Sequence, residues 1–268
     1  MKGAIAAGHP LTADAGARIL AEGGNAVDAC VAAAFVSWVT ESPLTGPGAG
    51  GFMLVHRARD RSDRVLDFFV AAPGAGLAQD DGGAMVAVDV PFGADAIQVF
   101  RIGAASCGVP GTVAGLAEAH RRYGTLPWRE LVAPAAELAR TGIGITPAQA
   151  FLHLVLDAPL RHSAEGRRIY GRSRPLGEGD RLVMADLART LERLAETGRN
   201  QVLAGVAPPA EIDQDVEHEE RNQYQVDQSR SRHKEVRERS GSPGLRCFDQ
   251  GVGRSKKRIN PVAKNAVQ

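Results

Sequence analysis

The sequence predicts a mixed α/β (α+β) fold followed by a disordered tail. Two observations indicate this fold class. Helical and strand-like apolar patterns alternate through the first 200 residues, and the sequence then becomes polar and mixed in charge. A hydrophobic content of 44% and a charged content of 24% are ordinary for a globular protein. We therefore expect a folded region over residues 1–200 and a tail over 201–268.

Two helices are predicted at the start of the chain. Thr12 can cap a helix that runs to about Glu22, where a Gly-Gly pair ends it. Asn25 can cap a second helix over residues 26–39. This second segment is rich in Ala and Val and has few polar interruptions, so we expect it to be buried on nearly all sides.

Strand-like runs follow the two helices. "GFMLVHR" (51–57) and "RVLDFFVAA" (64–72) flank the polar turn "RDRSD" (59–63). Two β-rich runs joined by a short polar turn predict a hairpin. "GAMVAVDV" (83–90) is a further candidate strand.

Four helices are predicted in the rest of the folded region. The stretch 110–124 has Pro110 near its start and Gly124 just past its end. The stretches 127–142, 146–158 and 185–198 repeat apolar residues at helical spacing. Gly142 should end the first of these three, and Leu187, Leu191 and Leu194 should line one face of the last.

The tail has too little apolar sequence to fold by itself. Of its 68 residues, 22 are Asp, Glu, Lys or Arg and 20 are hydrophobic. Its basic cluster is read as a solvated charge run and not as a nucleic-acid site. The cluster comprises Arg254, Lys256, Lys257 and Arg258. A net charge of +1 for the whole chain likewise predicts neither nucleic acid nor a membrane surface as a partner.

The sequence also argues against a signal peptide, a membrane span, a disulfide framework and a metal site. The first residues lack an unbroken apolar run, so no signal peptide is predicted and a cytoplasmic location is expected. The longest apolar run, 29–39, is too short to span a bilayer. Cys30, Cys107 and Cys247 form no disulfide or zinc pattern, and the seven histidines have no metal-binding spacing. No metal and no cofactor are expected.

The stretch "TGPGAGGF" (Thr45–Phe52) fits the dinucleotide-binding spacing G-x-G-x-x-G. That motif needs a strand before the glycines and a helix after them, whereas here the predicted helix comes first. The candidate ribose-binding acid, Asp67, falls within the predicted hairpin. We therefore interpret the glycines as a structural turn between a buried helix and a strand. The turn comprises Gly46, Gly48, Gly50 and Gly51.

Three blocks of the sequence, taken in order, form a recognisable pattern. The first runs from "AAGHPLTADAG" through "EGGNAVDAC" to "TGPGAGGFMLV". The second is "GVPGTVAGLAEAHRRYGTLPWRELVAPAAELARTGIGI", and the third is "DLARTLERLAETG". Together they resemble the γ-glutamyltranspeptidase family, and the resemblance covers residues 1 to about 200.

The resemblance implies part of a four-layered αββα fold of the N-terminal nucleophile hydrolases. Members are made as precursors that cut themselves into a large and a small subunit. The new N-terminal Thr of the small subunit is the nucleophile, and its α-amine can take the hydroxyl proton. A γ-glutamyl ester then passes its acyl group to water or to an amino acid.

Only the large-subunit part of the family pattern is matched. No Thr-Thr-His run is found, and the threonines of the matched blocks follow no self-cleavage segment. "GAASCG" around Ser106 does not fit a nucleophile elbow. We expect no catalytic residue in this chain and no activity of the chain alone. The threonines are Thr40, Thr45, Thr112, Thr141 and Thr146.

Two readings of the chain remain open at this stage. It is either a large subunit that needs a separately encoded small subunit, or a non-functional truncated fragment. Val202 and Leu203 stand where the family has Phe-Tyr, which a shift of reading frame near Gln201 would produce. A genuine lineage-specific tail is the alternative. If the chain is complemented, its substrate is expected to be a small γ-glutamyl compound or a related acyl amide.

One substrate-binding position departs from the family pattern. Where the family has Asp-Phe-Arg-Glu, this chain has "DFFV", so Phe69 stands at the position of the Arg that grips the donor's carboxylate. An apolar residue there would suit the cephalosporin-acylase-like branch, which hydrolyses bulky acyl amides. Alternatively, Arg57 or Arg64 takes over the role.

Overall fold

The computed structural model describes residues 3–73, 83–93 and 95–198. Its elements, in chain order, are α1 (Pro10–Ala21), α2 (Ala26–Thr40), β1 (Phe52–Arg57), β2 (Ser62–Asp67), β3 (Val86–Pro91), β4 (Ile97–Ile102), the 3₁₀ turn η1 (Ala104–Ser106), α3 (Thr112–Tyr123), α4 (Trp128–Thr141), β5 (Ile143–Gly144), α5 (Pro147–Val155), α6 (Asp157–Leu160), α7 (Ala164–Tyr170), β6 (Arg181–Leu182) and α8 (Ala185–Thr197). The predicted mixture of helices and strands is confirmed.

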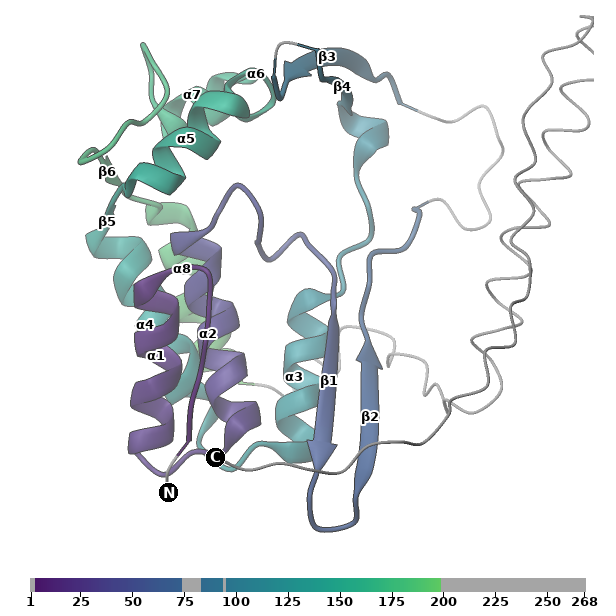
Figure 1. Cartoon of the computed structure of the whole chain (residues 1–268), viewed down its shortest axis with the longest axis vertical. Helices are drawn as coiled ribbons and strands as arrows, with labels where there is room; N and C mark the ends of the chain where they lie inside the picture. The colour runs from purple at the N-terminus through teal and green to yellow at the C-terminus, as the bar shows by residue number, and fades with distance from the viewer. Residues whose placement is uncertain (1–2, 74–82, 94, 199–268) are drawn as a thin grey trace, which may run out of the picture. The chain divides into compact units, whose positions relative to one another are not determined.

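Helix α2 is the centre of the helical part. It contacts α1, α3 and α4, and α4 packs along α8 (Figure 1). Twelve of its 15 residues are buried, which confirms the prediction of a helix covered on nearly all sides. Phe35 on α2 meets Trp38 and Trp128 edge-on, with ring centroids 4.8 and 5.2 Å apart. Such pairs add to the free energy that comes from apolar burial.

The start of α2 is held by a reciprocal cap. The side chain of Asn25 accepts hydrogen bonds from the N–H groups of Val27 and Asp28, and the Asp28 carboxylate accepts from the N–H of Asn25. This capping box confirms the predicted cap. Asp28 is fully buried and also accepts from the N–H and the hydroxyl of Thr125, the latter at 2.6 Å. One carboxylate therefore joins α2 to the loop between α3 and α4.

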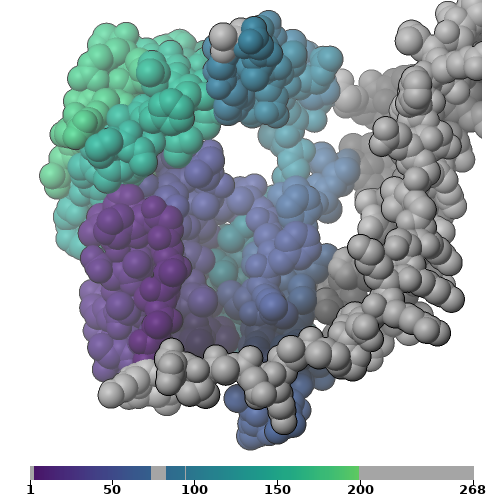
Figure 2. All heavy atoms as spheres, viewed as in Figure 1, coloured from purple at the N-terminus to yellow at the C-terminus, as the bar shows by residue number. Residues whose placement is uncertain are grey.

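Helix α1 begins earlier than predicted. His9 caps it, because Nδ1 accepts a hydrogen bond from the N–H of Leu11 at 3.2 Å, and Pro10 occupies the first helical position. Proline suits that position because its missing N–H has no partner there in any case. Thr12, the predicted cap, lies inside the helix, where its hydroxyl bonds to that of Thr40 at 2.7 Å. Figure 2 shows α1, in purple, at the surface.

Strands β1 and β2 form the predicted antiparallel hairpin, with Phe52 opposite Asp67 and Arg57 opposite Ser62. The second strand ends at Asp67 and does not continue to residue 72 as predicted. Arg61 in the connecting turn has a φ of 51°, a left-handed conformation that helps the chain reverse.

The two faces of the β1–β2 hairpin differ in burial. Val55 and Leu66 point towards the helices and are 8% and 9% exposed. Phe52 and Leu54 point the other way and are 59% and 68% exposed. Side chains alternate between the two faces of a strand. Both faces of this hairpin carry apolar residues, but described residues cover only the face of Val55 and Leu66.

Strand β3 confirms the prediction for residues 83–90, shifted slightly along the chain. It pairs with β4 in antiparallel register, Val86 opposite Ile102. Strand β4 is not among the predicted elements, although "IQVFRI" has strand-like composition. Val90 is the one residue of β3 that is fully buried, whereas Ile97 and Val99 on β4 are more than half exposed.

The four predicted helices of the second half are present as α3, α4, α5 and α8. Gly124 and Gly142 end α3 and α4 as predicted, and Gly142 has a φ of 82° that only glycine adopts easily. Leu191 of α8 is fully buried, and Leu187 and Leu194 pack against the core beside it. Helix α7 and the short β5–β6 pair are not among the predicted elements.

Among the described residues, no helix is both long and apolar enough to cross a membrane. The predicted tail, 201–268, with its basic cluster and the Val202–Leu203 junction, lies outside the described residues. The boundary at residue 200 therefore stays a prediction.

Replacing Asp28 with Asn should lower the free energy of unfolding by about 3 kcal/mol, because an amide group would face the donors of Asn25 and Thr125 inside the core. Urea unfolding followed by circular dichroism measures this change. The matched control is Asp14→Asn on the exposed face of α1, which should change stability by less than about 0.5 kcal/mol. Equal effects of the two variants would contradict the role given to Asp28.

Replacing His153 with Leu should raise stability by about 1 kcal/mol, because this 1% exposed ring is buried without a hydrogen bond of normal geometry, its nearest polar partner being the backbone of Leu176. Burial lowers the pKa of His153 from 6.5. Below about pH 6.5 the unfolded chain binds a proton at this residue more readily than the folded chain does, so the free energy of unfolding of the His153 protein falls with pH. The stability advantage of the Leu variant should therefore grow in acid. Melting temperatures between pH 5 and 8 measure both effects, with exposed His162→Leu as the control.

Candidate functional site

The glycine turn, residues 46–51, leads from α2 into β1. Gly51 continues the hairpin ladder beyond β1: its N–H donates to the carbonyl of Phe68 at 3.3 Å, and the N–H of Phe68 donates back at 3.0 Å. At Gly50, a Cβ would lie 2.4 Å from the backbone nitrogen of Val70. Any side chain there would force two backbones apart, so the close approach of these segments requires glycine.

The other two glycines of the turn have different surroundings. A Cβ at Gly46 or at Gly48 would meet no atom within 4 Å, and neither residue has a positive φ. The helix–turn–strand order expected from the sequence is present, because α2 precedes the glycines and β1 follows them. That order is the reverse of a dinucleotide-binding motif. Asp67 accepts a hydrogen bond from the N–H of Phe69, within the end of the hairpin.

The glycine turn meets the start of α3. The carbonyl of Ala49 accepts hydrogen bonds from the N–H groups of Gly111 and Thr112, both at 3.1 Å. A short bridge between Ala71 and Val109 adds a third segment. We call the meeting of residues 46–51, 68–71 and 109–112 the junction. It brings together the glycine turn and Phe69, both of which the sequence analysis selected.

Phe69 projects from the junction and is 59% exposed. Its ring stacks on that of Phe52, with centroids 5.4 Å apart and planes 11° from parallel. Arg57 and Arg64, the alternative carboxylate anchors, lie elsewhere on the hairpin. Arg57 is five positions along β1 from Phe52, about 17 Å at strand spacing, and it pairs with Asp60. The surface at this position is therefore aromatic.

The threonines considered as nucleophiles mostly make structural hydrogen bonds. Thr40 and Thr141 donate to backbone carbonyls one turn earlier in their own helices, Thr45 donates to the carbonyl of Ser37 in α2, and Thr146 caps α5. Thr112 is the exception, because its Oγ1 is buried with no partner. None of these hydroxyls lies beside a described base that could take its proton.

Ser106 likewise belongs to a local turn. Its hydroxyl donates to the carbonyl of Gly103 at 2.7 Å and accepts from the N–H of the same residue. This closed turn contains no nucleophile elbow, in agreement with the sequence analysis.

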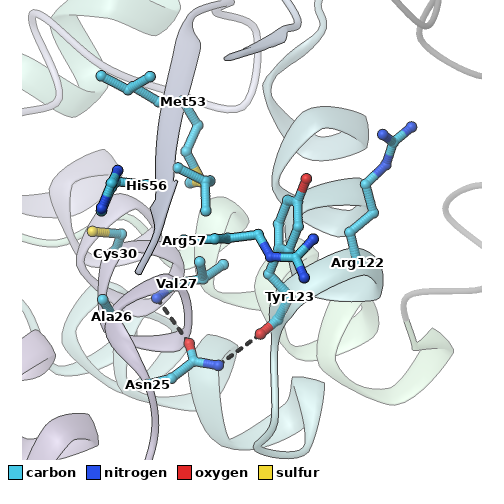
Figure 3. Close-up of a pocket in the computed structure, with 11 residues that line it drawn as sticks. Asn25, Ala26, Val27, Cys30, Met53, His56, Arg57, Arg122 and Tyr123 are labelled. Atoms are coloured by element: carbon cyan, nitrogen blue, oxygen red, sulfur yellow. Dashed lines mark hydrogen bonds between the residues drawn. The ribbon is translucent and has the colours of Figure 1, made fainter. Parts of the chain in front are cut away.

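A pocket of about 460 Å³ lies along the free edge of β1 (Figure 3). Its lining comes from the first turns of α2, from Met53–Arg57 on β1 and from the end of α3. Asn25 fixes one wall, because its side-chain amide donates to the carbonyl of Tyr123 at 2.6 Å. Such a volume is within the range of small-molecule sites. Sequence reasoning missed this pocket, since its residues come from three distant segments that share no motif.

The cations around the pocket all have carboxylate partners. Arg57 lies 3.1 Å from Asp60, and Arg122 lies 2.5 Å from Glu118. Hydrogen bonds from Arg121 and then from Arg122 lower the pKa of Glu118 to about 2, against the opposing effect of burial. These guanidinium groups are thus engaged in ion pairs.

Cys30 also lines the pocket. It is accessible to solvent, yet partial burial raises the pKa of its thiol, which favours the unreactive protonated form. Within the described ranges, no group of three or more His, Cys, Asp or Glu residues could hold a metal ion.

Comparison with known proteins gives a consistent family. The family model described as gamma-glutamyltranspeptidase matches residues 12–209. The chain is 32% identical over 206 residues to the glutathione hydrolase proenzyme of Bacillus subtilis (strain 168), covering 76% of this chain and 34% of that protein. It is 33% identical over 210 residues to the acylase ACY 1 proenzyme of Pseudomonas sp. (strain SE83), covering 76% and 36%.

A solved structure agrees with the predicted fold. The gamma-glutamyltranspeptidase of Pseudomonas nitroreducens, complexed with L-DON, superposes with a TM-score of 0.61 at 34% identity, covering 76% of this chain and 57% of that one. The chain spans about a third of the length of the curated relatives it matches. With three quarters of its own length matched in sequence and in structure, the chain belongs to the gamma-glutamyltranspeptidase family.

Proposed function

We propose that this chain is the large-subunit part of an enzyme that transfers or hydrolyses γ-glutamyl or related acyl groups. It acts only when a small-subunit part supplies the N-terminal Thr nucleophile, and it is inactive alone. The observation that carries this proposal is the match of residues 12–209 to the family, combined with coverage of only a third of the relatives' length.

The exposed apolar groups on the outward face of the hairpin support the proposal that another chain or segment binds here. Phe52, Leu54 and Phe69 are each more than half exposed and lie on one side of the β1–β2 hairpin and its extension. Exposed apolar groups gathered in this way are typical of an interface with another chain or segment. The junction beside them is built from backbone contacts and needs nothing further for its own support.

The donor is proposed to carry an apolar acyl group. The stacked pair of Phe52 and Phe69 offers an aromatic surface and no cation where the family pattern has a carboxylate-binding Arg. A γ-glutamyl donor would lose a bidentate charge-assisted pair at this point. The similarity to the acylase ACY 1 proenzyme agrees with a donor of the acylase kind.

The second candidate is a non-functional fragment produced by a shifted reading frame. The observation that favours it is the change to polar sequence after residue 200. Resequencing the genomic DNA across the codons for 198–268 and several hundred bases beyond distinguishes the two. A shifted or following frame that encodes a Thr-Thr-His segment would identify half of a broken or split acyltransferase.

The purified chain should release no 4-nitroaniline from γ-glutamyl-4-nitroanilide above the rate in buffer. The physical reason is that the hydroxyls of the candidate threonines and of Ser106 have no described base beside them. A hybrid precursor in which residues 1–200 replace the matching part of the Bacillus subtilis relative should cut itself and release the chromophore from an acyl anilide. Turnover by the pure chain would contradict the proposal.

In that hybrid, Phe69→Arg should raise kcat/KM for γ-glutamyl-4-nitroanilide about 10- to 100-fold and lower that for phenylacetyl-4-nitroanilide, because a guanidinium can pair with the donor carboxylate. The matched control is Phe151→Arg on α5, which is 64% exposed and distant in sequence from the junction. No change with either donor would count against a donor-binding role for position 69.

A further inference from the structure

A buried polar cluster lies where three helix ends meet. We call it the His9 cluster, and it comprises the buried residues His9, Thr12, Thr40 and Gln149 together with the half-buried Glu41. His9 caps α1, Glu41 follows the last residue of α2, and Gln149 belongs to the first turn of α5. The amide of Gln149 donates to the carbonyl of Thr40, so α2 and α5 are joined directly.

The hydrogen bond that caps α1 fixes the protonation state of His9. Nδ1 accepts from the N–H of Leu11, so Nδ1 carries no proton, and the neutral ring carries its proton on Nε2. Nε2 is buried and makes no hydrogen bond of normal geometry, although the side chain of Gln149 lies close enough to oppose the effect of burial on this ring. Protonation would place an N–H at Nδ1 facing the N–H of Leu11, and two donors cannot bond to each other. The cap therefore exists only while His9 is neutral.

The surroundings of His9 contain one nearby charge. Burial lowers the pKa of His9 from 6.5, and the negative charge of Glu41 opposes this effect only in part. Helix α5 contributes the uncharged Gln149 to the cluster, and His153 lies one turn further along the same helix. Asp14, the next acidic residue of α1, is exposed. Because the folded pKa lies below 6.5, the cap is present near neutral pH and is lost as pH falls.

Glu41 connects this cap to the glycine turn. Its carboxylate lies against the residue before His9, since a Cβ at Gly8 would be 2.2 Å from Oε1. Its backbone carbonyl accepts hydrogen bonds from the N–H groups of Leu44 at 2.8 Å and Thr45 at 3.1 Å. Residue 45 immediately precedes the glycine turn. Glu41 therefore joins the two regions within one residue: its carboxylate lies beside Gly8, and its carbonyl holds the two residues that lead into the glycine turn.

We propose that His9 is a proton-sensitive contact that couples the start of α1 to the glycine turn. In its neutral form it caps α1 and leaves Glu41 in place. In its protonated form it loses the bond from Leu11 and attracts the Glu41 carboxylate, which releases the anchor of Leu44 and Thr45. The junction is then ordered near neutral pH and loosened in mild acid.

Hydrogen–deuterium exchange of the full chain at pH 7.5 and 5.5, corrected for intrinsic exchange rates, tests the coupling. Peptides covering 10–14 and 43–51 should both lose protection about tenfold at pH 5.5, while peptides from α4 keep theirs. His9→Asn supplies a cap that does not titrate, so it should keep both segments protected at both pH values. His153→Leu should leave the loss unchanged, which separates the effect from the other buried histidine.

Glu41→Gln separates the two halves of the proposal. Without the carboxylate charge, residues 10–14 should still lose protection in acid, and residues 43–51 should not. Three results would overturn the proposal: no pH effect in either segment, the same loss in His9→Asn, or a parallel loss in α4 that indicates global unfolding. Circular dichroism at pH 7.5 establishes beforehand that each variant is folded.

Discussion

The buried carboxylate of Asp28 is the interaction on which the helical part depends. A carboxylate with no access to water must be met by donors, and these come from Asn25, three positions away, and from Thr125, 97 positions away. This requirement fixes the start of α2 against the loop before α4. Because α2 in turn contacts α1, α3 and α4, its placement sets the frame to which the hairpin is attached.

The junction is attached to this frame at both ends. The glycine turn leaves the end of α2, and the carbonyl of Ala49 receives the first N–H groups of α3. Only backbone groups make these contacts, so the position of Phe69 is set by glycines at 50 and 51 and not by its own side chain. The side chain at position 69 can therefore vary without disturbing the fold that presents it.

Much of the fold could be predicted from local signals. The structure follows local sequence patterns at three places. These are the cap formed by Asn25 and Asp28, the alternating burial around Val55, and the glycines that end α3 and α4. The cap at His9 could not be predicted in this way, because the choice between His9 and Thr12 depends on Thr40, which is distant in the sequence. The pocket beside β1 and the stacking of Phe52 on Phe69 also depend on tertiary pairing. Strand β4 was missed because Val99 and Phe100 are adjacent apolar residues, so that "IQVFRI" does not alternate strictly.

The inner face of the hairpin has a consequence for the order of synthesis. Val55 and Leu66 are covered by helical residues, yet α3 begins 45 positions after β2 ends. At ordinary rates of translation this interval takes about 2 to 9 s. During that time a nascent chain presents apolar groups on both sides of a two-stranded ribbon, which is marginally stable alone. Until α3 is made, this ribbon is therefore exposed to unwanted association with other apolar segments.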